Sequence, residues 1–149
     1  MLLEFCCSLL ILLFSYASLS KVLEYDKFVF QMSLSHVEVI KASARFLAWS
    51  VPLLELGIVV LLLLPRTKAL GLYTSLLLLI IFSLYIAGML LSGTNLPCTC
   101  GGIISKLSWK GHLAFNLFFI LVNTIAIIHY RKTNNPAKKK DMNINFSRV

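Results

Sequence analysis

The stretch Ala69–Leu91, ALGLYTSLLLLIIFSLYIAGMLL, contains no charged residue over its whole length. An α-helix rises 1.5 Å per residue, so this stretch would be about 34 Å long, enough to cross the roughly 30 Å hydrocarbon core of a bilayer. Its apolar residues surround the helix instead of forming one stripe, which is typical of a helix in lipid. The stretch therefore predicts a transmembrane helix.

Three further stretches have the same character: Leu2–Leu19, Phe46–Leu64 and His112–Tyr130. Of the 149 residues, 58% are hydrophobic and only 13% are charged, whereas a soluble domain carries about a quarter charged residues. The sequence lacks the alternating apolar and polar residues of a transmembrane β-barrel strand, so a membrane barrel is not expected. The sequence predicts an all-α protein, a four-helix transmembrane bundle.

The first apolar stretch has an alternative interpretation as a cleaved signal peptide. No Lys or Arg precedes it, Glu4 stands there instead, and no small-residue cleavage site is clear. We therefore favour a retained helix.

The positive charges predict how the bundle is oriented. Arg66 and Lys68 lie in the short connection between the second and third stretches, and more basic residues crowd the tail after Tyr130. Eight of the 14 Lys and Arg residues then fall on one side, which the positive-inside rule makes cytoplasmic. We expect an inner (cytoplasmic) membrane protein with both termini cytoplasmic and with residues 20–45 and 92–111 facing the periplasm.

The charge distribution divides the chain into a four-span domain, residues 1–130, and a basic cytoplasmic tail, residues 131–149, which we expect to be disordered. The net charge is +8. A basic run after a hydrophobic span is explained by contact with anionic lipid. No nucleic-acid-binding pattern is present, so the lipid bilayer is the expected partner of the tail.

The periplasmic segments contain two predicted interfacial helices and a cysteine pair. The segment after the first span, residues 21–30, mixes polar and aromatic residues as a short amphipathic helix does. The other segment carries Cys98 and Cys100 on a loop that begins with Pro97, and residues 103–109 are predicted to form a short helix after it. A disulfide that joins residues i and i+2 closes a very small ring, which makes it strained and labile. We therefore predict thiol–disulfide chemistry at Cys98 and Cys100.

Three other interpretations of the pair remain open. The cysteines could form a static disulfide that shapes the loop, or bind Cu(I) or Zn with His36 or His112 as a further ligand. They could also be two reduced, inert thiols, which an oxidising compartment disfavours. No second cysteine pair lies on the same face, which weighs against a metal. The adjacent Cys6 and Cys7 lie near the opposite membrane face and are interpreted as buried packing residues.

Polar residues inside the spans are the remaining site candidates. Glu55 lies in the second span, where an acid normally faces the bundle interior and is paired or protonated. Lys21, at the outer end of the first span, is its natural partner because its long stem can reach inward. A structural ion pair and a proton-handling Glu55 are equally compatible with the sequence.

Three polar residues share a face of the fourth span, spaced four and seven apart: His112, Asn116 and Asn123. We interpret Asn123 as an interhelical hydrogen-bonding residue. His112 and Asn116 lie near the cysteine loop, where His112 could act as a base toward a thiol.

The arrangement of these residues resembles the MauE branch of the DoxX-like integral membrane proteins. Four spans are combined with a Lys that closes the first, a Pro and Glu in the second, and a Cys-x-Cys-Gly loop before the last. The matching residues are Lys21, Pro52, Glu55, Gly57, Cys98, Cys100, Gly101 and Asn116. The resemblance covers the chain from the first span to the fourth and leaves the basic tail outside.

The resemblance implies a redox-associated membrane protein linked to methylamine metabolism, in which MauE supports a disulfide-rich periplasmic dehydrogenase subunit. We expect thiol–disulfide exchange with a periplasmic thioredoxin-like or disulfide-containing partner. Cys98 and Cys100 would react, with Lys21, Glu55, His112 and Asn116 in support. The alternatives are a non-catalytic assembly or scaffold subunit and a DoxX-like quinone-linked oxidoreductase subunit, although no quinone-site pattern is visible and no cofactor is firmly implied.

Overall fold

The computed structural model describes residues 1–33, 38–91 and 109–133, and these residues form helices joined by turns. Four helices are long: α1 (Leu2–Leu23), α4 (Ala44–Leu63), α5 (Lys68–Leu91) and α6 (Trp109–Thr133). Two short helices, α2 (Tyr25–Ser33) and α3 (Glu38–Ala42), lie between α1 and α4. No strand occurs in the part of the chain that the structure describes. The predicted all-α four-helix bundle is confirmed.

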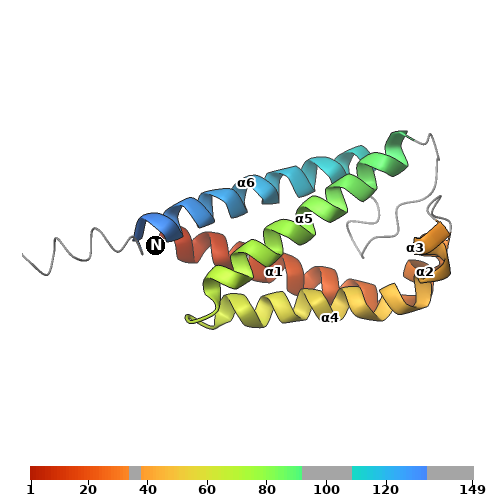
Figure 1. The fold of residues 1–149 in the computed structure, drawn as a ribbon, viewed down its shortest axis with the longest axis horizontal. Helices are drawn as coiled ribbons and strands as arrows, with labels where there is room; N and C mark the ends of the chain where they lie inside the picture. The colour runs from red at the N-terminus through yellow and green to blue at the C-terminus, as the bar shows by residue number, and fades with distance from the viewer. Residues whose placement is uncertain (34–37, 92–108, 134–149) are drawn as a thin grey trace, which may run out of the picture.

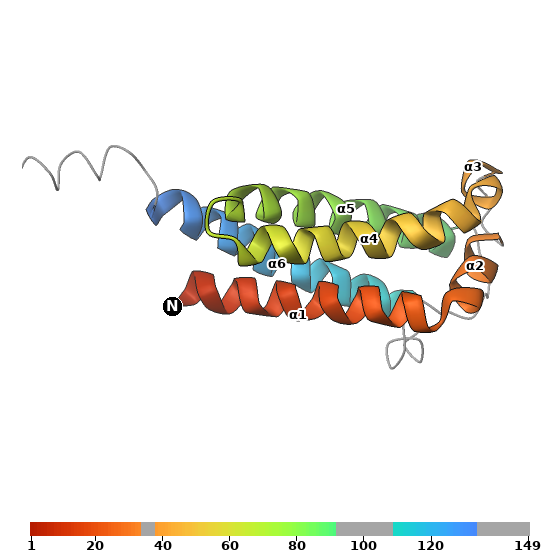
Figure 2. The ribbon, with the colours of Figure 1, turned by 90° about the horizontal axis from the view of Figure 1, so that it is seen from below.

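The long helices run alternately up and down, so that each packs against two others (Figures 1 and 2). Helix α1 contacts α4 and α6, and α5 contacts the same two helices. The N-terminus, the α4–α5 connection and the end of α6 lie at one end of the bundle, which we call the N-terminal end (Figure 1). The end of α1, helices α2 and α3, the end of α5 and the start of α6 lie at the other, which we call the capped end (Figure 1).

All four predicted spans are helices, and their observed ends differ from the predicted ones by up to four residues. Helix α1 continues four residues beyond Leu19, which places Lys21 inside its last turn. Helix α6 begins at Trp109, so His112 lies in its first turn. The apolar composition located the spans, but polar residues that continue a helix past its apolar run could not be assigned from hydropathy alone.

Helix α2 confirms the short helix expected after the first span, displaced toward Ser33. It packs against α4, and its Phe28 is buried. The helix predicted at residues 103–109 lies outside the described residues except for Trp109, which begins α6. The cysteine pair at 98 and 100 and the tail from 134 to 149 also lie outside them.

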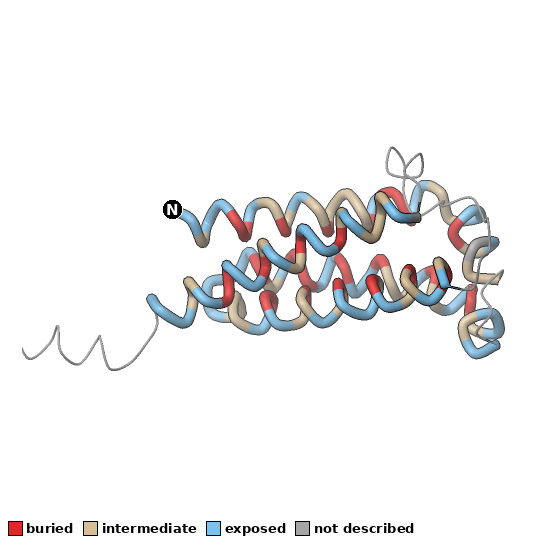
Figure 3. The backbone as a smooth tube through the Cα atoms, turned by 90° about the horizontal axis from the view of Figure 1, so that it is seen from above, coloured by how far each residue is buried: buried red, intermediate tan, exposed pale blue. Residues whose placement is uncertain are grey.

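The bundle buries one side of each long helix and leaves large apolar side chains on the other. Buried positions face the bundle interior and exposed positions face outward (Figure 3). Outward-facing apolar side chains occur on every long helix, for example Leu12, Leu53, Leu77 and Leu121. An apolar surface of this extent is unfavourable in water and favourable in lipid. Four of the described helices are long and apolar enough to cross a membrane.

The close approach of α4 and α5 depends on Gly71. A Cβ atom at this position would lie 3.0 Å from the backbone carbon of Leu61 and 3.0 Å from the backbone nitrogen of Leu62. Backbone atoms cannot move aside as a flexible side chain can. A side chain at position 71 would therefore press against the backbone of α4 and require the two helices to move apart by a small amount.

We expect Gly71→Ala to destabilise the bundle by about 1–3 kcal/mol, because the added methyl group overpacks a helix contact. Gly57→Ala is the matched control, since a Cβ at Gly57 would meet no atom within 4 Å. That variant should leave stability unchanged or raise it through the better helix propensity of Ala. Unfolding in detergent, followed by circular dichroism, measures both, and equal stabilities would contradict the packing argument.

Candidate functional site

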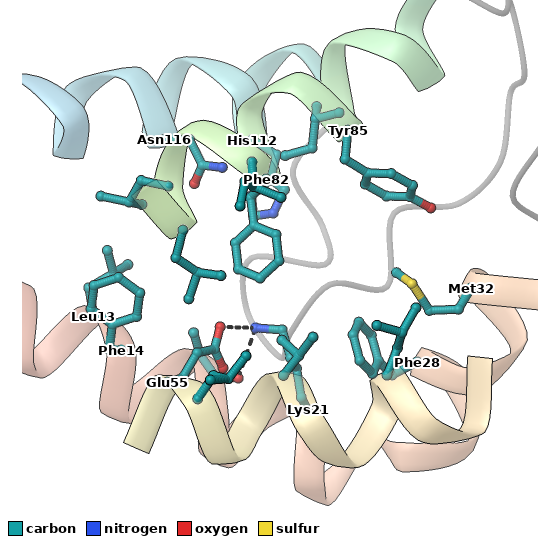
Figure 4. Close-up of a pocket in the computed structure, with 18 of the residues that line it drawn as sticks. Leu13, Phe14, Lys21, Phe28, Met32, Glu55, Phe82, Tyr85, His112 and Asn116 are labelled. Carbon is teal, nitrogen blue, oxygen red and sulfur yellow. Dashed lines mark hydrogen bonds and ion pairs between the residues drawn. The ribbon is translucent and has the colours of Figure 1, made fainter. Parts of the chain in front are cut away.

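A cavity of about 360 Å³ lies within the bundle toward its capped end. All six described helices contribute to its lining, and most of the lining side chains are apolar. Four of its polar residues are those that the sequence marked as supporting site residues: Lys21, Glu55, His112 and Asn116 (Figure 4). The fold therefore brings residues from the first, second and fourth spans into one space.

Lys21 and Glu55 form an ion pair at the edge of this cavity. The distance from Lys21 Nζ to Glu55 Oε1 is 2.7 Å, and the two side chains are only 7% and 1% exposed. The suggested pairing of Lys21 with Glu55 is confirmed. Removing two charges from water is costly, and their mutual attraction offsets that cost only when the geometry is good.

The direction of the Lys21 side chain explains how a residue in the last turn of α1 reaches into the bundle. Side chains of a helix point toward its N-terminus. Lys21 Nζ accordingly donates to the carbonyl oxygen of Ala17, one turn earlier, at 3.3 Å. Its ammonium group also lies 5.5 Å from the ring centre of Phe82 and 5.9 Å from that of Phe28. These rings shield the charge and attract it through their faces.

The second oxygen of the Glu55 carboxylate is unusual. Glu55 Oε2 is buried and has no hydrogen-bond partner among the described residues. A buried carboxylate oxygen without a donor is costly, so this atom requires an explanation, such as a water or a ligand that satisfies it. Glu55 itself is one of the residues that line the cavity.

His112 and Asn116 lie across the cavity from the ion pair, on α6 (Figure 4). The Nδ1 atom of His112 is buried and, within the described ranges, has no hydrogen-bond partner. Asn116 is 6% exposed. The expected grouping of these two residues at one end of the fourth span is confirmed, and within the described residues they share the cavity with Lys21 and Glu55.

Asn123, farther along the same face of α6, does not line the cavity. Its Nδ2 group donates to Ser75 Oγ at 2.7 Å and to the carbonyl oxygen of Leu72 at 3.2 Å, both on α5. The interpretation of Asn123 as an interhelical hydrogen-bonding residue is confirmed. A related bond joins α1 to α4, where Ser18 Oγ donates to the carbonyl oxygen of Pro52 at 3.0 Å. These contacts hold in place the helices that carry the site.

The sequence did not predict which apolar residues enclose Lys21, Glu55, His112 and Asn116. Phe28 and Met32 reach the cavity from α2, and Phe82 and Tyr85 reach it from α5 (Figure 4). Phe82 lies in a run that is apolar on every side, so nothing in its spacing distinguished it from lipid-facing neighbours. The amphipathic pattern of α2 was the one signal that could have pointed to Phe28.

The two pairs of cysteines occupy different parts of the chain. Cys6 and Cys7 are free thiols on α1, buried in the core of the bundle near the N-terminal end, which agrees with their interpretation as packing residues. Cys98 and Cys100 lie outside the described residues. The helices that flank that segment end at Leu91 and begin at Trp109, and both positions lie at the capped end (Figure 1).

These features define a class of protein: an all-α, multi-pass membrane protein with a buried ion pair beside an internal cavity. The sequence matches the family described as methylamine utilisation protein MauE over residues 1–129, and the chain belongs to this family. No match to the chain was found among the curated proteins or among the solved structures.

Proposed function

We propose that this MauE-family protein exchanges disulfides with a protein on the periplasmic side of the inner membrane, through Cys98 and Cys100. The observation that supports the proposal is that the two helix ends flanking the cysteine segment, the end of α5 at Leu91 and the start of α6 at Trp109, both lie at the capped end. Cys98 is seven residues from Leu91, so an extended chain keeps it within about 25 Å of that end of the bundle. The cysteines are thereby tethered near the end where the cavity lies.

The charges at the N-terminal end support the proposed orientation. Arg66 and Lys68 lie in and beside the α4–α5 connection, and Arg131 and Lys132 lie in the last turn of α6. The two groups share one end of the bundle, as the sequence required, and the positive-inside rule assigns that end to the cytoplasm. The capped end then faces the periplasm, where disulfides persist. The tail from 134 to 149 would remain cytoplasmic.

The proposed reaction is a balanced exchange of two thiols for one disulfide. The thiolate of one cysteine attacks a sulfur atom of the partner's disulfide, and the partner's other sulfur leaves as a thiolate. The second cysteine then attacks the mixed disulfide and releases the reduced partner, so that two electrons pass from Cys98 and Cys100 to the partner. The reverse sequence oxidises the partner. A thioredoxin-like protein or a disulfide-rich subunit of a methylamine-oxidising dehydrogenase fits this chemistry.

Trapping the mixed disulfide tests the proposal. In Cys98→Ser or Cys100→Ser, the resolving cysteine is absent, and we expect the remaining one to accumulate in a mixed disulfide with its partner. Cells are quenched with acid, free thiols are alkylated, and adducts are separated without reductant and identified by mass spectrometry. Cys6→Ala with Cys7→Ala serves as the background in which both variants are made. Absence of an adduct in both single variants would overturn the proposal.

A further inference from the structure

We infer that the cavity beside Lys21 and Glu55 is a binding site for a neutral aromatic alcohol, a molecule with a phenol-type ring that enters from the bilayer. This inference is independent of the proposed thiol chemistry, because it rests on described residues alone. The cavity volume of about 360 Å³ lies within the roughly 300–1,000 Å³ range of small-molecule sites. Its apolar lining with a few convergent polar groups is the usual composition of such sites.

The polar groups specify a ligand that both donates and accepts a hydrogen bond. Glu55 Oε2 is a buried acceptor that lacks a donor in the described part of the chain. The Lys21 ammonium has three protons, and among the described residues it donates to Glu55 Oε1 and to the carbonyl oxygen of Ala17. One hydroxyl group can donate to Glu55 Oε2 and accept the remaining proton of Lys21. A ketone or ether can only accept.

The ion pair also selects for a ligand without net charge. Lys21 and Glu55 neutralise each other at 2.7 Å. A charged ligand would leave one uncompensated charge in a low-dielectric interior, which is strongly unfavourable. A hydroxyl group on an otherwise apolar molecule satisfies the free oxygen without disturbing this balance.

The walls favour an aromatic ring next to the hydroxyl group. Phe28 and Phe82 place their rings on the side of Lys21 that faces the cavity, and Tyr85 and Met32 continue the wall beyond them (Figure 4). Aromatic pairs in offset or edge-to-face contact gain more than their area burial alone provides. The thioether of Met32 also contacts aromatic rings favourably.

The route into the cavity leads through the lipid-facing side of the bundle. Leu54 on α4 and Ile81 on α5 both line the cavity, yet their side chains are 58% and 50% exposed. In a membrane, this exposure is to lipid. A molecule dissolved in the bilayer would therefore meet the lining of the cavity at Leu54 and Ile81, on the lipid-facing surface of α4 and α5.

Three probes with the same ring and the same hexyl chain separate the contribution of the hydroxyl group from that of apolar burial. They are para-hexylphenol, para-hexylanisole, whose ether oxygen only accepts, and hexylbenzene, which has no polar group. Binding to the full chain in lipid nanodiscs is measured by saturation-transfer nuclear magnetic resonance, and empty nanodiscs give the partition blank. We expect the phenol to bind about tenfold more tightly than either other probe, because only it provides a donor for Glu55 Oε2.

Variants locate the bound probe. In Glu55→Gln, an amide nitrogen replaces the free acceptor, so the preference for the phenol over the anisole should be lost. Met32→Trp fills the cavity from α2 without touching the ion pair and should weaken binding of all three probes about tenfold. Phe30→Trp is its matched control, because Phe30 is on the same helix, is 61% exposed and does not line the cavity.

Two results would overturn the inference. Equal affinities for the three probes would mean that the cavity holds any apolar chain, such as a lipid tail. Binding of the phenol that Met32→Trp leaves unchanged would mean that the probe sits elsewhere. The Met32 and Phe30 variants keep the test decisive even if Glu55→Gln fails to fold.

Discussion

Replacing Lys21 by methionine is expected to destabilise the bundle by about 3–5 kcal/mol, the usual cost of removing one partner from a buried ion pair. Methionine preserves most of the length and apolar volume of the lysine stem. The loss would therefore come from the Glu55 carboxylate, which is 1% exposed and would keep no partner for either oxygen among the described residues. Detergent unfolding followed by circular dichroism measures this free energy.

The double variant Lys21→Met with Glu55→Leu is the informative control. Replacing both partners by apolar residues of similar size removes the charges and their desolvation cost together, so such changes are often neutral or stabilising. We expect the double variant to recover most of the stability that Lys21→Met loses. If the double variant were as unstable as the single one, the loss would arise from packing around Lys21 instead of an unpaired charge.

A second, more exposed ion pair provides a control for the effect of burial. Lys68 Nζ lies 3.1 Å from Glu4 Oε1 at the N-terminal end, where the glutamate side chain is 69% exposed. Exposed pairs contribute about 0–1 kcal/mol. Lys68→Met should therefore lower stability far less than Lys21→Met, although both remove a lysine from a close contact with a glutamate.

The sequence predicted the spans and the ion pair for the same physical reason. Long runs without charge have few favourable structures other than a helix in lipid. Within such runs Glu55 is costly enough to require a partner, and Lys21 is the one cation on the neighbouring span with a stem that reaches inward. When every alternative structure carries a large energetic penalty, the remaining structure can be predicted from a single sequence.

The cavity could not be predicted because no single residue determines it. It depends on how α4 and α5 separate after their close contact at Gly71, and on α2 folding back over the capped end. Both are properties of packing between segments distant in sequence. In lipid, the outward and inward sides of a helix are similarly apolar, so Phe82 and Leu84 look alike in sequence. Phe82 lines the cavity, whereas Leu84 is 67% exposed.

The double variant Cys98→Ser with Cys100→Ser is expected to abolish disulfide exchange and to leave the fold unchanged. Thiolate sulfur is the nucleophile of this reaction, and a serine hydroxyl cannot replace it. The redox state of the periplasmic partner, measured by alkylation of its thiols, should then no longer depend on the membrane protein. The exchange rate should fall to the background rate measured without the membrane protein, because the nucleophile and its resolving partner are removed together.

Cys6→Ala with Cys7→Ala is the matched control, because it removes the same number of thiols from the buried core near the N-terminal end. Its exchange activity should match that of the unaltered protein once equal amounts are compared. A scaffold protein would behave differently, since it would support its partner's assembly without Cys98 and Cys100. Full function of the Cys98→Ser, Cys100→Ser protein would therefore favour the scaffold, because a protein that holds its partner through helix surfaces does not need the sulfur atoms.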